Sequence, residues 1–169
     1  MAIIFLFFMV CLVWAIMIYN RLVRDRQRAL TAWSDIDVQL KRRHDLVPKL
    51  VAAVEQYARY ERATLQTVIA LRSRAEQAST LKDRAPLENR LGSGLHNLIA
   101  LVESYPELKA DRSFLQLQNE LTEVENQIQY ARRFYNGSVR NLNTRLATFP
   151  DLFIARAFHY PPAPFFELG

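Results

Sequence analysis

The sequence predicts an all-α protein anchored in a membrane, and three observations support this fold class. The first 19 of its 169 residues carry no charged side chain. Beyond them, apolar residues recur at steps of three and four, and no stretch alternates with a period of two for long enough to indicate a sheet. Half of the residues are apolar and 23% are charged, which is typical of a folded core and not of a disordered chain.

We therefore expect three parts. An N-terminal transmembrane helix (1–19) continues into an antiparallel four-helix bundle (20–148), because short connections between long helices favour that arrangement. An extended tail rich in aromatic residues and proline (149–169) follows, docked on the bundle or on a neighbouring subunit. The length suits one domain of ordinary size.

The segment from Ala2 to Tyr19 is long enough to cross a bilayer, because about 20 residues at a rise of 1.5 Å match a hydrocarbon thickness of roughly 30 Å. A cleavable signal peptide is the competing interpretation, but it needs a basic start, a shorter apolar run and a small-x-small cleavage site, which the sequence lacks. Four arginines follow the span and are expected to contact anionic lipid headgroups: Arg21, Arg24, Arg26 and Arg28. By the positive-inside rule the N-terminus faces outward and the soluble body lies in the cytoplasm.

Cys11 is the only cysteine. A single thiolate excludes an intramolecular disulfide and a cysteine-based zinc site, since both need at least two. Because Cys11 lies within the predicted span, we expect a small structural residue surrounded by lipid. No cofactor is expected.

The first helix is expected to continue from the span through Trp33, a core residue, and to stop near Arg43. The stretch 44–48 is then expected to end the first helix and begin the second, because Asp45 can cap free N–H groups and Pro48 is tolerated in a first turn. The break should separate the first helix from the second.

The second helix is expected over about 46–79, where Leu50 and later apolar positions form a stripe at steps of four and three. A loop (79–86) precedes the third helix, which should end at Tyr105-Pro106. The fourth helix is expected over 114–149, with Leu121 and Ile128 in the core.

Four prolines from Pro150 onward predict that the tail is not helical, while its aromatic rings make it too apolar to stay free. We expect these rings to contribute to a contact between subunits of a homo-oligomer. The candidate interface residues are Phe153, Phe158, Tyr160, Phe165 and Phe166.

Several stretches of the sequence form specific motifs. The longest is AWSDIDVQLKRRHDLVPKLV (Ala32–Val51), in which a WSxIDVQL block is followed by Leu-x-Pro. The others are Tyr19-Asn20-x-Leu22-Val23, Tyr105–Lys109, LQLQNELTEVENQI (115–128), ARRFYN (131–136) and Phe149-Pro150. Together they resemble the LemA family of bacterial membrane-anchored proteins, from about Tyr19 to the C-terminus. Members often have Tyr-Asn where this chain has Leu142-Asn143.

The resemblance implies a single N-terminal span, a four-helix body facing the cytoplasm, and no established enzymatic activity. It places the protein in a bacterial plasma membrane or a membrane-derived organelle, since some LemA-like proteins belong to magnetosome membranes. Others are encoded near membrane metalloproteases, so a membrane protease is among the expected partners. The residues that carry the resemblance, with structural roles expected, are Trp33, Asp37, Gln39, Lys41, Arg42, Arg43, Asp45, Pro48, Tyr105, Pro106, Gln118, Glu120, Glu125, Asn126, Arg132, Arg133, Tyr135, Asn136, Phe149 and Pro150.

Motifs for catalysis are missing from the sequence. No histidine has a glutamate three positions before it, so the Glu-x-x-His motif of metal sites in bundles is absent. Neither a His-Glu-x-x-His motif, a Gly-x-Ser-x-Gly motif nor a phosphate-binding glycine-rich loop occurs. We expect no catalytic residue and no metal site, and we expect His44, His96 and His159 to lie at the surface or to cap helices.

Two charged features have more than one interpretation. Glu61 lies on the stripe of the second helix, where a buried general base is one interpretation and an ion pair with Arg132 or Arg145 is the favoured one. The Lys41–Arg43 run invites a nucleic-acid interpretation, but a recognition motif with interleaved aromatic residues is missing. We expect a solvated cluster at a helix C-terminus, and no nucleic-acid partner.

Three functions remain open at this stage. The favoured one is a membrane-anchored, non-enzymatic scaffold or adaptor that acts by self-association and protein binding, with the lipid bilayer, further copies and other membrane proteins as partners. The alternative is a protein that remodels the membrane or organises anionic lipid. An undiscovered hydrolase or metal enzyme is least favoured, because no reactive site is evident.

Overall fold

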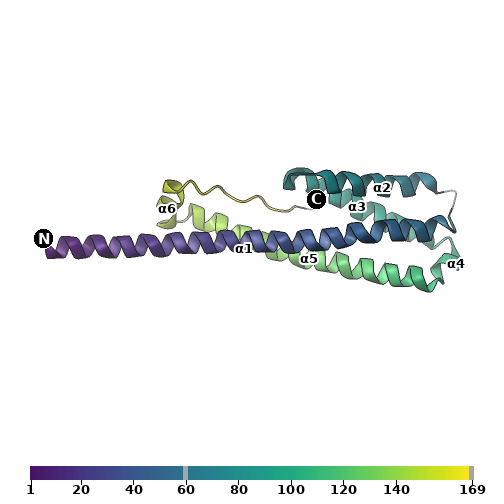
Figure 1. The fold of residues 1–169 in the computed structure, drawn as a ribbon, viewed down its shortest axis with the longest axis horizontal. Coiled ribbons are helices and arrows are strands. Elements are labelled where there is room, and N and C mark those ends of the chain that lie inside the picture. The colour runs from purple at the N-terminus through teal and green to yellow at the C-terminus, as the bar shows by residue number, and fades with distance from the viewer. Residues whose placement is uncertain (59–60, 168–169) are drawn as a thin grey trace. The chain divides into compact units, whose positions relative to one another are not determined.

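A computed structural model describes residues 1–58 and 61–167. This part of the chain is helical and contains no strand, which confirms the predicted all-α class (Figure 1). The helices are α1 (Ala2–Glu55), α2 (Arg62–Gln77), α3 (Leu81–Val102), α4 (Pro106–Lys109), α5 (Arg112–Ala147) and α6 (Asp151–Ala157).

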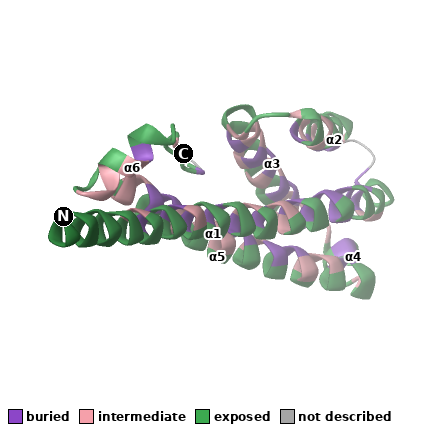
Figure 2. Ribbon diagram, turned by 60° about the vertical axis from the view of Figure 1, so that its left-hand side comes forward, coloured by how far each residue is buried: buried purple, intermediate pink, exposed green. Residues whose placement is uncertain are grey.

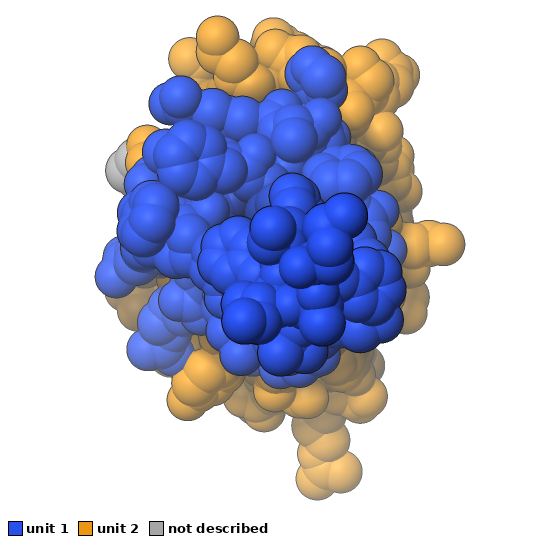
Figure 3. All heavy atoms as spheres, turned by 90° about the vertical axis from the view of Figure 1, so that its left-hand side faces the viewer, with its two compact units in different colours: residues 1–35, 131–165 blue, residues 36–130, 166–169 orange. Residues whose placement is uncertain are grey.

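The chain divides into two compact units, which Figure 3 colours separately. Unit 1 consists of residues 1–35 and 131–165. Unit 2 consists of residues 36–130 and the residues from Phe166 onward. Helices α1 and α5 therefore each contribute to both units.

The first part of α1 is apolar and exposed, as Figure 2 shows by its uniform colour. Residues 2–14 are all exposed, and the first buried side chain is Ile18. This segment is long and apolar enough to cross a membrane, as predicted.

The predicted break in 44–48 is wrong, because α1 continues to Glu55. Asp45 is thus an exposed residue inside a helix and not a cap, and Pro48 is exposed as well. A continuous buried stripe explains why one proline does not end the helix, since the packing of the whole face outweighs a local cost of about 3 kcal/mol. The stripe in unit 2 consists of Ile36, Leu40, Arg43, Val47, Leu50 and Val54, at steps of four and three.

The predicted second helix over 46–79 is also wrong. The chain leaves the helix after Glu55, and α2 begins at Arg62. The sequence has no glycine or proline between Glu55 and Arg62, so local propensity does not predict that α1 ends there. The buried side chains of Val54 and Ala58 anchor the turn, where the Ala58 N–H donates to the Val54 carbonyl at 2.8 Å.

Helix α3 begins at Leu81, within the predicted 79–86 loop. Thr80 is its N-cap: the hydroxyl accepts a hydrogen bond from the Asp83 N–H at 3.2 Å and donates one to the Asp83 carboxylate at 2.6 Å. The predicted end at Tyr105-Pro106 is late, because α3 ends at Val102 and these two residues open the short α4.

Helices α2 and α3 pack closely together at Gly94. A Cβ atom on Gly94 would lie 3.3 Å from Cγ2 of Val68 and 3.8 Å from Cδ1 of Leu71. Glycine therefore permits this close approach of the two helices.

The core agrees with three of the four predicted residues. Leu50, Leu121 and Ile128 are 2%, 4% and 1% exposed. Trp33 is only half-buried, and its ring centroid lies 5.7 Å from that of Tyr135.

The prediction that the tail is extended and contains no helix is wrong in part, because α6 lies between Pro150 and Phe158. Pro150 occupies the N-cap position, where its missing N–H costs no helical hydrogen bond. Beyond α6 the segment is extended and docks on α5 of the same unit. The Asn143 side-chain amide donates to the Ala163 carbonyl and accepts from the Ala163 N–H, both at 2.9 Å. We call this pair of hydrogen bonds the Asn143 clamp.

A further hydrogen bond fixes the same segment, because the Tyr135 hydroxyl donates to the Pro164 carbonyl at 2.8 Å. This part of the tail therefore docks on its own chain.

Candidate functional site

Charged side chains occupy positions on the buried helix faces of each unit. In unit 2, Arg43 and His44 of α1 and Glu88 of α3 are 3%, 2% and 1% exposed. In unit 1, Asp25 of α1 is 7% exposed. Burying a charge is costly unless it is paired, so the partners of these groups decide what each site can do.

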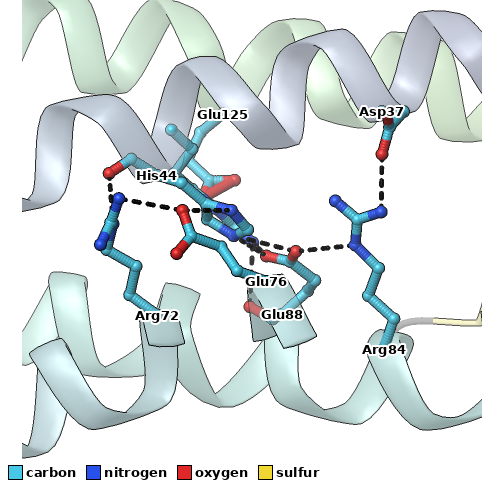
Figure 4. Close-up of polar contacts among 8 residues, drawn as sticks. Asp37, His44, Arg72, Glu76, Arg84, Glu88 and Glu125 are labelled. Atoms are coloured by element: carbon cyan, nitrogen blue, oxygen red, sulfur yellow. Dashed lines mark hydrogen bonds and ion pairs between the residues drawn. The ribbon is translucent and has the colours of Figure 1, made fainter. Parts of the chain in front are cut away.

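The unit 2 cluster is centred on the ion pair between Arg43 and Glu88. Figure 4 shows Glu88 with its labelled neighbours His44 and Arg84. The Arg43 guanidinium donates to the Glu88 carboxylate at 2.5 Å and to the Glu88 backbone carbonyl at 3.1 Å. It also donates to the carboxylate of Glu125 on α5. One arginine thus joins three helices of this unit.

His44 belongs to the same cluster, so its predicted surface or capping role is wrong. Its Nε2 atom lies 3.0 Å from Oε1 of Glu88, and its Nδ1 atom lies 3.8 Å from a carboxylate oxygen of Glu76 on α2. The physical reason is the continuity of α1, which keeps His44 beside Arg43 on a buried face. His96 and His159 are exposed, as predicted.

Two more arginines complete the network (Figure 4). Arg84 of α3 lies 2.6 Å from Asp37 of α1 and 3.3 Å from Glu88. Arg72 of α2 lies 2.9 Å from Glu76. Each carboxylate of the cluster therefore has a cationic neighbour.

Pro48 has a specific role at the edge of this cluster. Proline has no N–H, so it cannot donate to the carbonyl four residues earlier, which is that of His44. The Arg72 Nε atom donates to this carbonyl at 2.8 Å. An acceptor freed by the proline in α1 is thus used to hold α2.

The charge on Glu88 follows from its neighbours. Burial raises the pKa of the Glu88 carboxyl, but the hydrogen bond with His44 and the positive charge of Arg43 outweigh this, and the pKa lies below its usual value. Glu88 is therefore ionised at neutral pH and is a weak base. Its oxygens are occupied by His44, Arg43 and Arg84, so the geometry suits structural pairing better than proton transfer.

A pocket of about 340 Å³ borders the cluster within unit 2. Arg43, Glu88 and Glu125 form part of its wall, together with polar residues that include Ser93 and His96. Within residues 1–58 and 61–167 no group of three or more His, Cys, Asp or Glu side chains could hold a metal ion. The charged groups of the wall are engaged with one another.

Unit 1 contains a smaller, partly buried charged cluster, in which Asp25 is the buried member. Arg145 of α5 lies 2.6 Å from Asp25 of α1 and 3.0 Å from Asp151 of α6. The hydrogen bond with Asp25 raises the pKa of Arg145, burial opposes this, and Asp151 adds to the increase. Arg28 lies 3.7 Å from Asp25. This cluster joins α1, α5 and α6.

The predicted pairing of Glu61 with Arg145 or Arg132 is wrong. Glu61 is the N-cap residue of α2 and is half-exposed, since the long helix that would have placed it on a stripe does not form. Arg145 pairs instead with two aspartates of its own unit.

The Lys41–Arg43 run is not a solvated helix end. Lys41 and Arg42 are exposed, and Arg42 lies 3.5 Å from Glu123, but Arg43 is buried inside the cluster. The helix continues beyond these residues, so they do not meet a helix C-terminus.

The remaining predicted residues are distributed as follows. Arg21 and Arg24 are exposed, and Arg26 lies over the Tyr160 ring at 5.9 Å. Gln39 has a buried side-chain oxygen without a hydrogen-bond partner. Of the tail aromatics, Phe153, Phe158 and Phe165 are exposed, Tyr160 is half-buried, and Phe166 is fully buried within the chain and so cannot face a neighbouring subunit.

Sequence reasoning missed Glu88, Asp25, Asp151 and Asn143. A signal for Glu88 was present, because it lies on the buried stripe of α3 between Ala85 and Leu91 at steps of three. A carboxylate on an apolar stripe predicts a buried cation nearby. No comparable pattern marks Asn143, whose partner lies in an irregular segment.

Comparisons with known proteins give one consistent result. The model of the LemA family matches residues 32–169. Protein LemA from Metamycoplasma hominis is 29% identical over 131 residues, which cover 77% of this chain. The chain spans about 60% of the length of that curated relative. Since the family model matches well over half of the chain, and includes the WSxIDVQL block and the residues of the unit 2 cluster, this protein belongs to the LemA family.

Proposed function

We propose that this LemA-family protein is a membrane-anchored helical scaffold, which acts by binding proteins, further copies of itself included, and not by catalysis. The central observation is α1 itself: its exposed apolar segment and the helix that carries Arg43 and His44 are parts of one element. The membrane would be a bacterial plasma membrane or an organelle derived from it, with the helical body in the cytoplasm.

The buried charges support a non-catalytic role. In the unit 2 cluster every carboxylate has a cationic neighbour, and Glu88 is held in its ionised form. A general base needs a free lone pair and a pKa near the working pH, and neither is found at Glu88. Paired buried charges are instead suited to fixing how helices align.

Unit 2 also presents apolar side chains that a protein partner could cover. Val38 on α1, Ile69 on α2 and Leu115 on α5 are 62%, 46% and 42% exposed. Single exposed apolar residues are common on protein surfaces, so these positions serve as places to probe for a partner.

Membrane anchoring is tested by two charges in the span. Phe8→Arg combined with Leu12→Arg should move the full chain from the membrane fraction to the soluble fraction, because each arginine at the centre of a span costs about 2.5–3.5 kcal/mol. A matched control places two arginines at exposed residues of α2, Gln66 and Ala70. If both variants fractionated alike, the proposed membrane anchor would be contradicted.

Binding is tested by photo-cross-linking in intact membranes. A photoreactive residue at Val38, Ile69 or Leu115 should give discrete products, among them one of twice the chain mass. Exposed polar positions, Gln77 and Lys82, are the controls. If no position gives a cross-linked product, the scaffold function is contradicted.

A second candidate function is the organisation of anionic lipid. It is favoured by Arg21 and Arg24, which are exposed directly after the apolar segment. If this is the main role, the purified protein alone deforms liposomes that contain anionic lipid. A scaffold leaves such liposomes unchanged.

A further inference from the structure

Three phenylalanines in and beside α6 are exposed, although the helix also has a packed side that includes the buried Ala155. Phe149, Phe153 and Phe158 are 75%, 62% and 59% exposed. The rings of Phe149 and Phe153 meet edge to face, with centroids 5.9 Å apart. We call these three residues the α6 aromatic surface.

The opposite face of α6 is packed against α1 where the apolar segment ends. Ala155 and Ile154 belong to a core cluster with Ile18 and Leu22 of α1. The Phe158 ring lies 4.8 Å from the ring of Tyr19. All of these residues belong to unit 1, so the position of α6 along α1 is a property of that unit.

This position fixes the depth of the α6 aromatic surface. If residues 2–19 cross the hydrocarbon layer, Tyr19 lies at the membrane–water interface, where amphipathic aromatic rings are enriched. A helix packed on Ile18 and Leu22 lies at the same level. Exposed phenylalanine at this level meets the boundary between headgroups and acyl chains, and not bulk water.

The charges around α6 favour contact with anionic headgroups. Arg156 is exposed, and in α6 it is three positions from Phe153, which places both on one side of the helix. The acidic residue of α6, Asp151, is paired with Arg145 at 3.0 Å, which reduces its repulsion of lipid phosphate. Arg21 and Arg24 of α1 add exposed positive charge nearby.

We propose that the α6 aromatic surface is a second membrane contact, which inserts into the interface of the same bilayer that α1 crosses and takes anionic lipid as its ligand. A second copy of the chain is the other possible occupant. The bilayer is favoured because α6 is held beside the end of the apolar segment, so any anchored chain brings its own ligand to this surface.

The contact depends on the membrane anchor proposed above, and one set of labels tests both. The full chain is placed in vesicles of phosphatidylethanolamine and phosphatidylglycerol, with the fluorophore NBD on a single cysteine. Phe153→Cys in a Cys11→Ser background reports on α6. Phe134→Cys in the same background is the matched control, because Phe134 is also a phenylalanine of unit 1 and is 61% exposed.

The control lies at a different level of the same unit. Phe134 adjoins Tyr135, whose ring contacts Trp33, and Trp33 lies about 21 Å further along α1 than Tyr19 at a rise of 1.5 Å per residue. Cys11 labelled in the unmodified chain reports on the span, since its side chain is exposed.

The expected result is that NBD at 153 emits at shorter wavelength than NBD at 134, because the membrane interface is less polar than water, and that nitroxide-labelled lipid quenches it. Aqueous iodide should quench only NBD at 134. If Cys11 is quenched by the lipid but 153 behaves like 134, the second membrane contact is overturned while the anchor stands. Shielding of 153 from both quenchers identifies a second copy as the occupant and also overturns it. If the nitroxide-labelled lipid does not quench NBD at Cys11, both the membrane anchor and the α6 contact are contradicted.

Discussion

Glu88 shows how one buried side chain can join several elements. It contacts Arg43 and His44 of α1 and Arg84 of its own helix, and it is 1% exposed. Removing one partner of a buried ion pair leaves an uncompensated charge, which is more costly than the pair itself is favourable. Glu88 is therefore a sensitive point of unit 2.

Neutralising Glu88 should destabilise the protein strongly. Glu88→Gln leaves Arg43 with a weaker partner, and we expect a loss of about 3–5 kcal/mol in the free energy of unfolding. Glu123→Gln is the matched control, because this carboxylate is 58% exposed and its pair with Arg42 should contribute at most about 1 kcal/mol. Urea unfolding of the full chain in mild detergent measures both, and equal losses would contradict the buried pairing.

The same residue makes stability depend on pH. The pKa of Glu88 is lowered in the folded chain from its ordinary value of 4.5, so its contribution is present above pH 4.5 and is lost as the pH falls through the folded pKa. The stability difference between wild type and Glu88→Gln should therefore narrow below pH 4.5. A difference that stays constant down to strongly acidic pH would show that Glu88 is not the titrating group.

Pro48 and Arg72 should be energetically coupled. Arg72→Ala leaves the His44 carbonyl without its donor, at a cost of about 1–3 kcal/mol. In a Pro48→Ala background the backbone N–H of residue 48 can donate to that carbonyl, so the same change should cost less. The Arg72–Glu76 pair is present in both backgrounds and cancels in the double-mutant cycle. Arg74→Ala, at an exposed position of α2, should show no coupling to Pro48.

At the scale of elements, the sequence predicted that the elements are helices better than it predicted where each helix begins and ends. The all-α class and the apolar N-terminal helix followed from periodicity and composition. The break at 44–48 was inferred from Asp45 and Pro48, although the stripe Leu40, Arg43, Val47 continues across it. The end of α1 at Glu55 carries no local signal, and the α6 helix between prolines was missed because it is set by packing on Ile18 and Leu22.

The candidate sites were harder to predict than the helices. Arg43 lay in a recognised motif, but its basic neighbours suggested a solvated run, and its burial depends on α3 and α5 meeting α1. Arg145 was expected to form an ion pair, but its partners Asp25 and Asp151 come from both ends of the chain. Such pairs depend on tertiary contacts that no short pattern encodes.

The Asn143 clamp should control the extended part of the tail. Asn143→Ala removes both hydrogen bonds to Ala163, so we expect faster hydrogen exchange in a peptide covering 158–167. Prolines at 161, 162 and 164 carry no N–H, so between Pro161 and Phe165 the amide signal comes from Ala163 and Phe165. Asn141→Ala, on an exposed position of α5, should leave the exchange unchanged. If both variants exchange like wild type, the clamp does not hold the tail.

At the scale of the whole molecule, topology can be tested with one thiol. We expect Ser79→Cys, at an exposed position between α2 and α3, to resist a membrane-impermeant thiol reagent in intact cells when Cys11 is replaced by serine. The reason is the positive-inside rule, since four arginines follow the apolar segment within a few residues and none precedes it. Labelling should appear once the cells are permeabilised. Ready labelling of intact cells would reverse the orientation.

The pair between Asp25 and Arg145 also determines when the molecule can be completed. The two residues are 120 positions apart, whereas Arg43 and Glu125 are 82 apart, and residues 36–130 of unit 2 lie in the sequence between the two halves of unit 1. At about 5–20 residues per second, the ribosome reaches Arg145 roughly 6–24 s after Asp25. The apolar segment would by then have left the ribosome and reached the bilayer, and unit 2 would have all of its charged partners. We therefore expect the charged cluster of unit 2 to form before the Asp25–Arg145 pair of unit 1, on a chain whose apolar segment is already in the membrane.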